Sequence, residues 1–132
     1  MLLTKECDYG IRIIRALAGY EKKTVEAICD SEHVPAQYAY KILKKLEHNG
    51  FVQSWRGRDG GYQLIKPSHT FTLYDIVHAV NENLFIFECL REDVYCSRND
   101  PKQLCSIYLE LERIQKSLTD EMQRKTMDKL LS

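Results

Sequence analysis

The stretch Arg56-Gly57-Arg58-Asp59-Gly60-Gly61-Tyr62, with the segments on either side of it, decides the fold of this chain. A helix-like segment runs from Pro35 to His48 and ends at Gly50, and a short strand follows over 51–55. After the turn, a second strand is predicted over 62–65. A helix followed by a β-hairpin with two arginines at its tip is typical of a winged helix-turn-helix. In that arrangement the helix enters the major groove of DNA, and the hairpin tip reaches the neighbouring minor groove or the backbone.

The segment before the hairpin predicts a helix with two distinct faces. The side chains expected on the core side are Tyr38, Ile42, Leu43 and Leu46; the opposite stripe carries Gln37, Tyr40, Lys41, Lys44 and His48 at helical spacing. Gln is suited to adenine, Lys to guanine or phosphate, and Tyr to phosphate or a thymine methyl group. We therefore predict DNA contacts from the first four residues of this stripe.

The turn of the hairpin contributes the remaining predicted DNA-binding residues. Arg56 and Arg58 have the chemistry to enter a narrow minor groove. Gly57 permits a positive φ and a close approach to a backbone. Asp59 would repel phosphate, so we assign it to formation of the turn.

The charge balance agrees with a local basic surface rather than a general polyanion binder. The chain has 19 basic and 19 acidic residues, and a formal net charge of zero. Residues 36–66, however, hold 6 basic and 2 acidic residues. Positive potential is therefore expected on the helix and hairpin, where phosphate contacts require it.

The rest of the N-terminal half predicts three more helices. Thr4 is expected to cap a first helix that closes near Gly19, with Ile11, Ile14, Leu17 and Ala18 on its core side. Thr24 is expected to cap a short helix over 25–29, followed by a turn over 30–34, and Pro35 suits the first position of the next helix. Thr70 or Thr72 is expected to cap a helix carrying Leu73, Ile76, Val77 and Val80 on one side.

The C-terminal part predicts a dimerisation helix. Asp100 and Pro101 form a typical helix start, and an apolar seam follows, made of Leu104, Ile107, Leu111, Ile114, Leu118 and Met122. A helix of about 25 residues or more with one apolar seam needs a partner helix. Since the chain has no second long helix, a homodimer is expected, and its symmetry suits a palindromic operator. The predicted fold class is mainly α with a small β-hairpin wing. It divides into a DNA-binding domain (1–80), a cysteine-bearing loop (81–99) and the dimerisation helix (100–132).

The five cysteines fall into two groups. Cys89, Cys96 and Cys105 form a C-x6-C-x8-C array, and three converging thiols could hold a metal or an iron–sulfur cluster. The spacing alone is weak evidence for such a site, because no short C-x2-C pair is present, and on spacing alone inert or redox-active thiols are somewhat favoured. Cys7 and Cys29 lie beside apolar residues and are expected to be small core side chains.

Several classes of protein are disfavoured. No apolar leader follows Met1, and no window approaches the roughly 18–20 apolar residues of a membrane span, so a cytoplasmic protein without membrane contact is expected. No catalytic pairing is suggested by spacing. The glycines of 57–61 lie between two strands and not before a helix, so an enzyme with a small-molecule substrate is not expected.

Several motifs together resemble the Rrf2 family of bacterial transcription regulators. They are the start Thr4-Lys5 with Asp8-Tyr9-Gly10, the helix ending at Gly50, the wing Arg56-Gly57-x-x-Gly60-Gly61-Tyr62-x-Leu64 and the segment Thr72-Leu73-x-Asp75-Ile76-Val77-x-Ala79-Val80. The resemblance covers nearly the whole chain. It implies a winged-helix dimer, held by crossed C-terminal helices, that binds operator DNA.

The resemblance also implies a cofactor. Several members of the family hold a 2Fe–2S or 4Fe–4S cluster through three cysteines in the region where Cys89, Cys96 and Cys105 stand. One branch adds a histidine three residues after the last cysteine, where this chain has Tyr108. The nitric-oxide-sensing branch instead has an Asp near the N-terminus of the other subunit, at the position that Asp8 matches. Asp8 is thus the expected fourth ligand, with His33 and Glu6 as alternatives.

Three functions remain open on the sequence. The first is a homodimeric DNA-binding transcription regulator that senses iron–sulfur status, redox state or nitric oxide through the cluster. The second is a cluster-free regulator that responds to thiol oxidation, a small molecule or a protein partner. The third is a zinc-stabilised interaction module, which the basic helix and wing disfavour.

Overall fold

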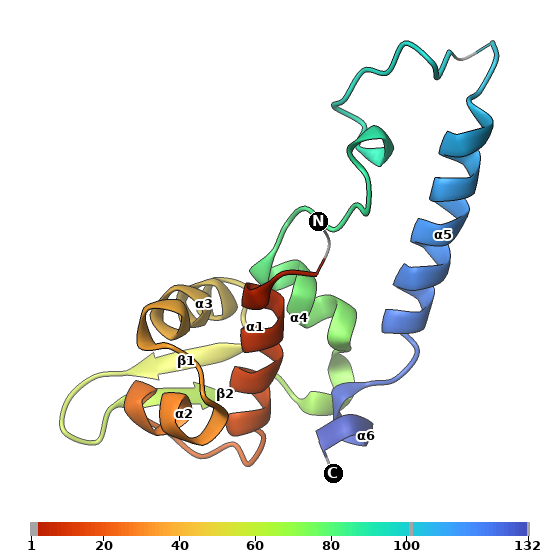
Figure 1. The fold of residues 1–132 in the computed structure, drawn as a ribbon. Helices are drawn as coiled ribbons and strands as arrows, with labels where there is room; N and C mark the ends of the chain where they lie inside the picture. Colours follow the sequence, from red (N-terminus) through yellow and green to blue (C-terminus); the bar gives the residue numbers. More distant parts are fainter. Residues whose placement is uncertain (1–2, 101, 132) are drawn as a thin grey trace.

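The computed structural model describes residues 3–100 and 102–131, and it is mainly helical with a two-stranded wing (Figure 1). The elements are α1 (Lys5–Ala16), α2 (Val25–Glu32), α3 (Ala36–His48), β1 (Val52–Trp55), β2 (Gly61–Leu64), α4 (Leu73–Val80), α5 (Ser106–Met122) and α6 (Met127–Leu131), with 3-10 turns η1 (Ser68–Thr70) and η2 (Glu88–Leu90). The predicted fold class, a winged helix-turn-helix with a C-terminal helix, is confirmed.

Threonine caps start three of the helices, as predicted. The Thr4 hydroxyl accepts a hydrogen bond from the Cys7 amide at 3.4 Å, and the Thr24 hydroxyl accepts one from the Ala27 amide at 3.1 Å. Thr72, not Thr70, precedes α4, and its amide donates to the Asp75 carboxylate at 2.8 Å in a capping box. Each cap satisfies an amide that the first helical turn leaves without a partner.

The ends of α1 and α2 differ from the prediction. Helix α1 ends at Ala16 rather than near Gly19, and α2 continues to Glu32 rather than stopping at Cys29. Arginines of α1 hold this additional turn, because Arg12 donates to the Glu32 carbonyl at 3.0 Å and Arg15 donates to the Glu32 carboxylate at 3.0 Å. His33 then closes the helix in the left-handed conformation, with φ of 55°.

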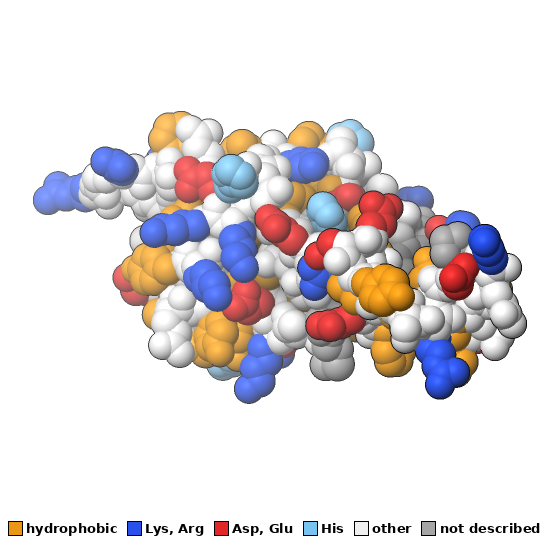
Figure 2. Space-filling view, turned by 90° about the horizontal axis from the view of Figure 1, so that it is seen from above, with side chains coloured by type: hydrophobic (Ala, Val, Ile, Leu, Met, Phe, Trp, Pro, Cys, Tyr) orange, Lys and Arg blue, Asp and Glu red, His pale blue; other side chains and the backbone are white. Residues whose placement is uncertain are grey.

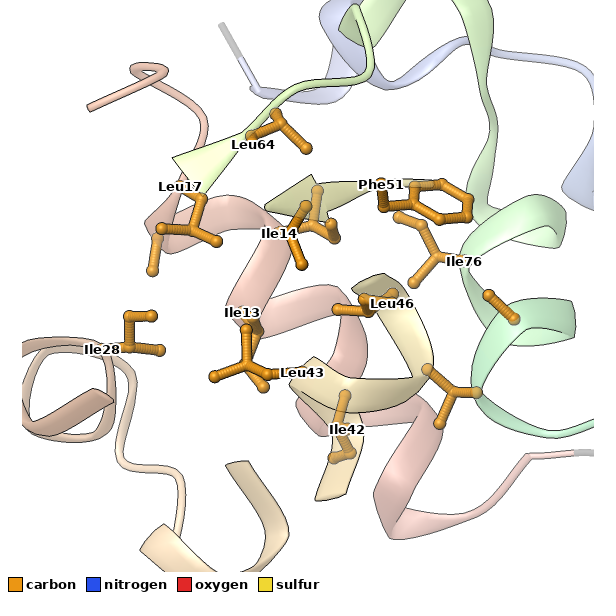
Figure 3. Close-up of a cluster of buried hydrophobic side chains, with 14 of the residues drawn as sticks. Ile13, Ile14, Leu17, Ile28, Ile42, Leu43, Leu46, Phe51, Leu64 and Ile76 are labelled. Atoms are coloured by element: carbon orange, nitrogen blue, oxygen red, sulfur yellow. The ribbon is translucent and has the colours of Figure 1, made fainter. Parts of the chain in front are cut away.

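The core lies where α1 is enclosed by α2, α3, α4 and the wing, and Figure 3 shows its side chains converging from these elements. Ile14 and Leu17 are buried as predicted, but Ile13 is fully buried as well, whereas Ile11 and Ala18 are only partly buried. The buried face of α1 is wider than one stripe because helices pack on several of its sides. In α3, Ala39 replaces Tyr38 as the fully buried residue of the first turn.

The wing is an antiparallel hairpin close to the predicted strands: the first strand starts one residue later than predicted, and the second starts and ends one residue earlier. Val52 pairs with Leu64 and Trp55 pairs with Gly61. Lys23, just before α2, forms an isolated bridge with Tyr62: its amide donates to the Tyr62 carbonyl at 2.9 Å, and the Tyr62 amide donates back at 2.8 Å. The wing is therefore joined to the start of the helix-turn-helix on the side away from β1.

Gly61 makes this bridge possible. Its φ is +143°, and a Cβ atom at this position would lie 2.5 Å from the carbonyl oxygen of Lys23. A side chain here would separate the two backbones, so only glycine fits this position without a shift of the chain.

The C-terminal half differs most from the prediction. Asp100 does not cap a helix: its carboxylate accepts a bond from the Lys102 amide at 2.8 Å and its carbonyl accepts one from the Gln103 amide at 3.0 Å, which closes a separate turn. Helix α5 begins only at Ser106, with Cys105 as its N-cap, and has 17 residues. Pro101, which was predicted to occupy the first position of this helix, lies outside the described residues.

The chain after α5 turns back onto the N-terminal domain, so the expected helix of about 25 residues or more is interrupted. Met127 is only 2% exposed in the main core, and its amide donates to the Phe71 carbonyl at 2.9 Å. Burial of this side chain favours a break at residues 123–126 over a continuous helix. Figure 1 shows the N-terminal end of α5 projecting away from the domain, with the long segment after α4 leading toward this upper end and α6 following its lower end.

Candidate nucleic-acid interface and cysteine-bearing segment

The exposed stripe of α3 is the first part of the candidate interface. All five of its predicted members, Gln37, Tyr40, Lys41, Lys44 and His48, are exposed. The opposite face holds the helix rigidly, since Ala39, Ile42, Leu43 and Leu46 are 0% exposed. The stripe is thus presented outward by a helix whose other side is fixed in the core.

A groove of about 590 Å³ separates α3 from the wing. Three cationic side chains line it, Lys44 from α3 and Arg56 and Arg58 from the wing turn, together with the carboxylates of Glu26 and Glu47. Glu47 accepts a hydrogen bond from the Ser54 hydroxyl at 2.9 Å, which fixes the first strand of the wing against α3. Of the predicted helix residues, Lys44 therefore shares one concave surface with the predicted residues of the wing turn.

The wing turn extends beyond the body of the domain. Arg56, Gly57 and Arg58 are exposed, and Gly57 has φ of +97°, as predicted for a tight turn. In Figure 2, Lys and Arg side chains project from the left end of the molecule, where Figure 1 places this turn, and others gather nearby. Acidic side chains are interspersed further toward the centre of the same face.

The wing strands contain exposed residues near the turn that the sequence did not indicate as part of the interface. Trp55 is 43% exposed, and its indole N–H donates to the Gln63 side chain at 3.1 Å. Gln63 in turn donates to the Tyr20 carbonyl at 2.7 Å, and the Lys22 ammonium lies 5.3 Å from the centre of the Trp55 ring. The alternation of the strand, which places Gln53 and Trp55 on the exposed side, could have indicated Trp55 as a surface residue.

A second groove, of about 950 Å³, lies on the other side of α3, between the start of α1 and the end of α4. At its centre the Glu6 carboxylate accepts bonds from the Lys41 ammonium at 3.0 Å and the Lys45 ammonium at 3.2 Å. The hydrogen bond from Lys41 is the main cause that lowers the pKa of Glu6 below its ordinary value. Lys45 also donates to the carbonyl of Val80, the last residue of α4, at 3.0 Å.

The three cysteines of the C-terminal array all lie in the segment 81–105, and each is partly buried. Asn99 links two of them through the backbone: its amide donates to the Cys96 carbonyl at 3.1 Å, and its side-chain oxygen accepts from the Cys105 amide at 3.2 Å. Within residues 3–100 and 102–131 of the single chain, no three Cys, His, Asp or Glu side chains lie together as a group that could hold a metal ion.

The candidates for a fourth ligand have other contacts in the single chain. Asp8 is exposed and pairs with Arg12 at 3.1 Å. His33 forms the left-handed end of α2, and Glu6 pairs with the two lysines of α3. A contribution of Asp8 across a dimer concerns a second subunit, so it stays a prediction.

The two N-terminal cysteines have different surroundings. Cys7 is 2% exposed and packs with Val77 and Leu84, as expected for a small core side chain. Cys29 is partly buried, and this burial raises the pKa of its thiol. A raised pKa reduces the fraction of reactive thiolate at neutral pH.

Helix α5 presents much of its apolar seam to solvent in the single chain. It contains no buried residue, and Ile107 is 68% and Ile114 40% exposed. Toward its C-terminal end, Leu118 and Met122 pack against the cluster of Cys7, Val77 and Leu84, and the Gln115 side chain donates to the Leu84 carbonyl at 3.0 Å. None of the described helices is long and apolar enough to cross a membrane.

Comparison with protein families gives one match over nearly the whole chain. The model of the Rrf2 family, described as an iron-dependent transcriptional regulator, matches residues 3–132. Protein aau3 of Rhizobium meliloti is 28% identical over 134 residues, covering 99% of this chain and 85% of that protein. Protein rrf2 of Nitratidesulfovibrio vulgaris is 30% identical over 101 residues, covering 74% of this chain and 67% of that protein.

Solved structures show the same fold. IscR of T. potens superposes with a TM-score of 0.75 at 19% identity, covering 99% of this chain and 86% of that one. CymR (YrzC), the global cysteine regulator of B. subtilis, superposes with a TM-score of 0.74 at 22% identity, covering 99% of this chain and 96% of that one.

Proposed function

This chain belongs to the Rrf2 family of transcriptional regulators, and we propose that it acts as a homodimer that binds double-stranded operator DNA and responds to a signal at its cysteines. The observation that carries the DNA-binding proposal is the groove between α3 and the wing. Lys44, Arg56 and Arg58 line it from both sides, and the exposed stripe of α3 lies beside it. Two cationic walls around an exposed helix suit a duplex whose backbone carries one negative charge per about 1.7 Å.

In the proposed complex, the two parts of this surface have different tasks. Gln37 and Tyr40, on the first turns of α3, contact base edges in the major groove, and Lys41 and Lys44 contact bases or phosphates. Arg56 and Arg58 enter the adjacent minor groove, where Gly57 lets the turn approach the backbone. The Lys23–Tyr62 bridge and the Ser54–Glu47 bond hold the wing at a fixed distance from α3.

Dimerisation is proposed to occur through α5. Its exposed isoleucines, Ile107 and Ile114, lie on the same apolar seam, and burying that seam against a second copy would remove it from water. A two-fold dimer would place two copies of α3 on successive major grooves of a palindromic site. In this proposal residues 1–80 bind DNA, 81–99 carry the sensor loop, and 100–132 supply the dimer contact through α5, while α6 packs on the DNA-binding domain.

The cysteines of segment 81–105 are proposed as the place where the signal enters. Their thiols are the donor type that iron–sulfur clusters use, and the iron-dependent description of the family supports a 2Fe–2S or 4Fe–4S cluster on Cys89, Cys96 and Cys105. Among the described residues of the single chain, no three such ligands lie together. Direct oxidation of these thiols is the second candidate, supported by their partial exposure.

Salt-dependent DNA binding tests the first part of the proposal. A selection from a random duplex library, followed by anisotropy titrations at several salt concentrations, should recover a palindromic site. Replacing Lys44 and Arg58 together by Gln should weaken binding and reduce the slope of log affinity against log salt by roughly 1.8, at about 0.9 per phosphate contact. Replacing Lys116 and Lys125 by Gln is the matched control, and equal loss in both pairs would refute the assignment of the surface.

Anaerobic purification tests the second part. An absorption spectrum with iron, sulfide and zinc analysis is expected to show bound iron and sulfide, which Cys96→Ala should abolish while leaving a folded dimer. Cys29→Ala is the control that should retain them. A colourless protein with stoichiometric zinc would make the array structural, and a metal-free protein that resists reconstitution would leave thiol oxidation as the signal.

A further inference from the structure

The ion pair between Glu6 and Lys41 joins two segments that the proposed DNA contact would have to separate. Lys41 belongs to the exposed stripe of α3, and its side chain is 59% exposed. Its ammonium nevertheless lies 3.0 Å from a carboxylate oxygen of Glu6, on the first turn of α1. A carboxylate occupies the position at Lys41 that a phosphate oxygen would occupy in a complex with DNA.

The Glu6 carboxylate is held in place more firmly than a surface side chain would be. Its side chain is only 23% exposed, and its second oxygen accepts a bond from Lys45 at 3.2 Å. Lys45 is itself anchored, because its ammonium also bonds the Val80 carbonyl at 3.0 Å. The charge of Lys45 thus satisfies the end of α4 and fixes Glu6 at the same time.

From this geometry we propose that Glu6 is an internal competitor of the DNA backbone: it holds the ammonium of Lys41 in the free protein and reduces the affinity for any duplex. The inference rests on the proposed function, since it requires that α3 faces DNA. In this arrangement the Glu6 carboxylate offsets the charge of Lys41 in the free protein, and Lys41 contributes its full charge to phosphate binding when the pair opens. Glu6 therefore limits sequence-independent affinity, so that base contacts on the same helix account for a larger share of binding to the operator.

The pairing of charges predicts a specific salt signature for Glu6→Gln. The variant frees Lys41 to neutralise one more phosphate, so the slope of log affinity against log salt should become steeper by about 0.9. Over a rise in salt from about 50 to 200 mM, that slope corresponds to roughly 3.5-fold more loss of affinity than in the wild type. The gain of Glu6→Gln over the wild type should therefore be largest at the lowest salt.

The experiment is an anisotropy titration of a fluorescein-labelled random-sequence duplex with wild type, Glu6→Gln, Lys41→Met and the double variant. Tighter binding by Glu6→Gln, and no further gain from it in the Lys41→Met background, would support the proposal. Unchanged or weaker binding, or a gain that persists in the Lys41→Met background, would overturn it. Glu121→Gln, which removes the same charge from α5, is the control and should bind like the wild type.

Two further measurements keep the result interpretable. Thermal unfolding checks that Glu6→Gln folds; if it does not, Glu6→Asp replaces it, since it keeps the charge but shortens the side chain by one methylene. The Asp variant should give a smaller gain in the same direction, and no gain would count against the proposal. Failure of the wild type and of every variant to bind DNA would instead refute the proposed function and, with it, this inference.

Discussion

Replacement of Gly61 by Ala should detach the wing from the helix-turn-helix. The added Cβ would lie 2.5 Å from the Lys23 carbonyl oxygen, and no ordinary contact is that short. The chain would have to open the two hydrogen bonds between Lys23 and Tyr62, which measure 2.9 and 2.8 Å. Alanine at φ of +143° adds backbone strain of its own.

The magnitude follows from these terms. Strain of about 1–3 kcal/mol and two hydrogen bonds at about 0.5–1.5 kcal/mol each give a loss of roughly 2–6 kcal/mol in the free energy of unfolding. A chain of this size loses roughly 3–5 °C in melting temperature per kcal/mol, so we expect a fall of at least about 6 °C. Because the wing would no longer be held beside α3, DNA affinity should fall as well, measured well below the melting temperature.

Thermal unfolding followed by circular dichroism is the assay, with two other glycines as references. Gly19 has open space around it and no left-handed φ, so Gly19→Ala should change stability by less than about 0.5 kcal/mol. Gly57 has φ of +97° but no atom within contact, so Gly57→Ala isolates the backbone strain. If Gly61→Ala has the same melting temperature as Gly19→Ala, the close approach of the wing to residue 23 does not stabilise the fold, and the reasoning is wrong.

Three further predictions concern the wing, the thiols and the dimer. Arg58→Gln should weaken DNA binding and reduce the salt slope by about 0.9, measured by anisotropy; an unchanged slope would place this side chain off the backbone and out of the minor groove. Burial raises the pKa of Cys29, so at pH 8 a smaller fraction of this thiol is thiolate. Its alkylation by iodoacetamide, followed by peptide mass spectrometry, should therefore be slower in the folded protein than in denaturant, and equal rates would contradict this. The double variant Ile107→Glu with Ile114→Glu should raise the dissociation constant of the dimer at least about ten-fold, or about 1.4 kcal/mol, in sedimentation equilibrium. Ser117→Glu, which is not part of the apolar seam, should leave the dimer intact.

The N-terminal half could be predicted from sequence because its signals are local. The caps Thr4 and Thr24 act within one turn, and the exposed stripe of α3 follows directly from helical spacing. The two faces of α3 and the glycines of the wing turn likewise depend only on neighbours in the chain. These elements agree with the prediction to within one residue at the wing and three residues at the helix ends.

What could not be predicted depends on contacts between distant segments. The pairs of Glu6 with Lys41 and Lys45 span 35 and 39 residues, and no local sequence pattern predicts them. The early end of α5 depends on the burial of Met127 against the domain, which local helix signals cannot reveal. The placement of the array cysteines could not be predicted for a similar reason, since η2 is the only helical turn in the described part of segment 81–105.

The chain segment from Asn81 to Thr126 is anchored to the same core at both ends. At one end the Val80 carbonyl is bonded to Lys45 of α3; at the other, the Met127 amide is bonded to the Phe71 carbonyl. Because both ends of this segment are bonded to one core, a displacement of α5 would reach that core through the end of α4 and through α6 together, rather than through a single hinge.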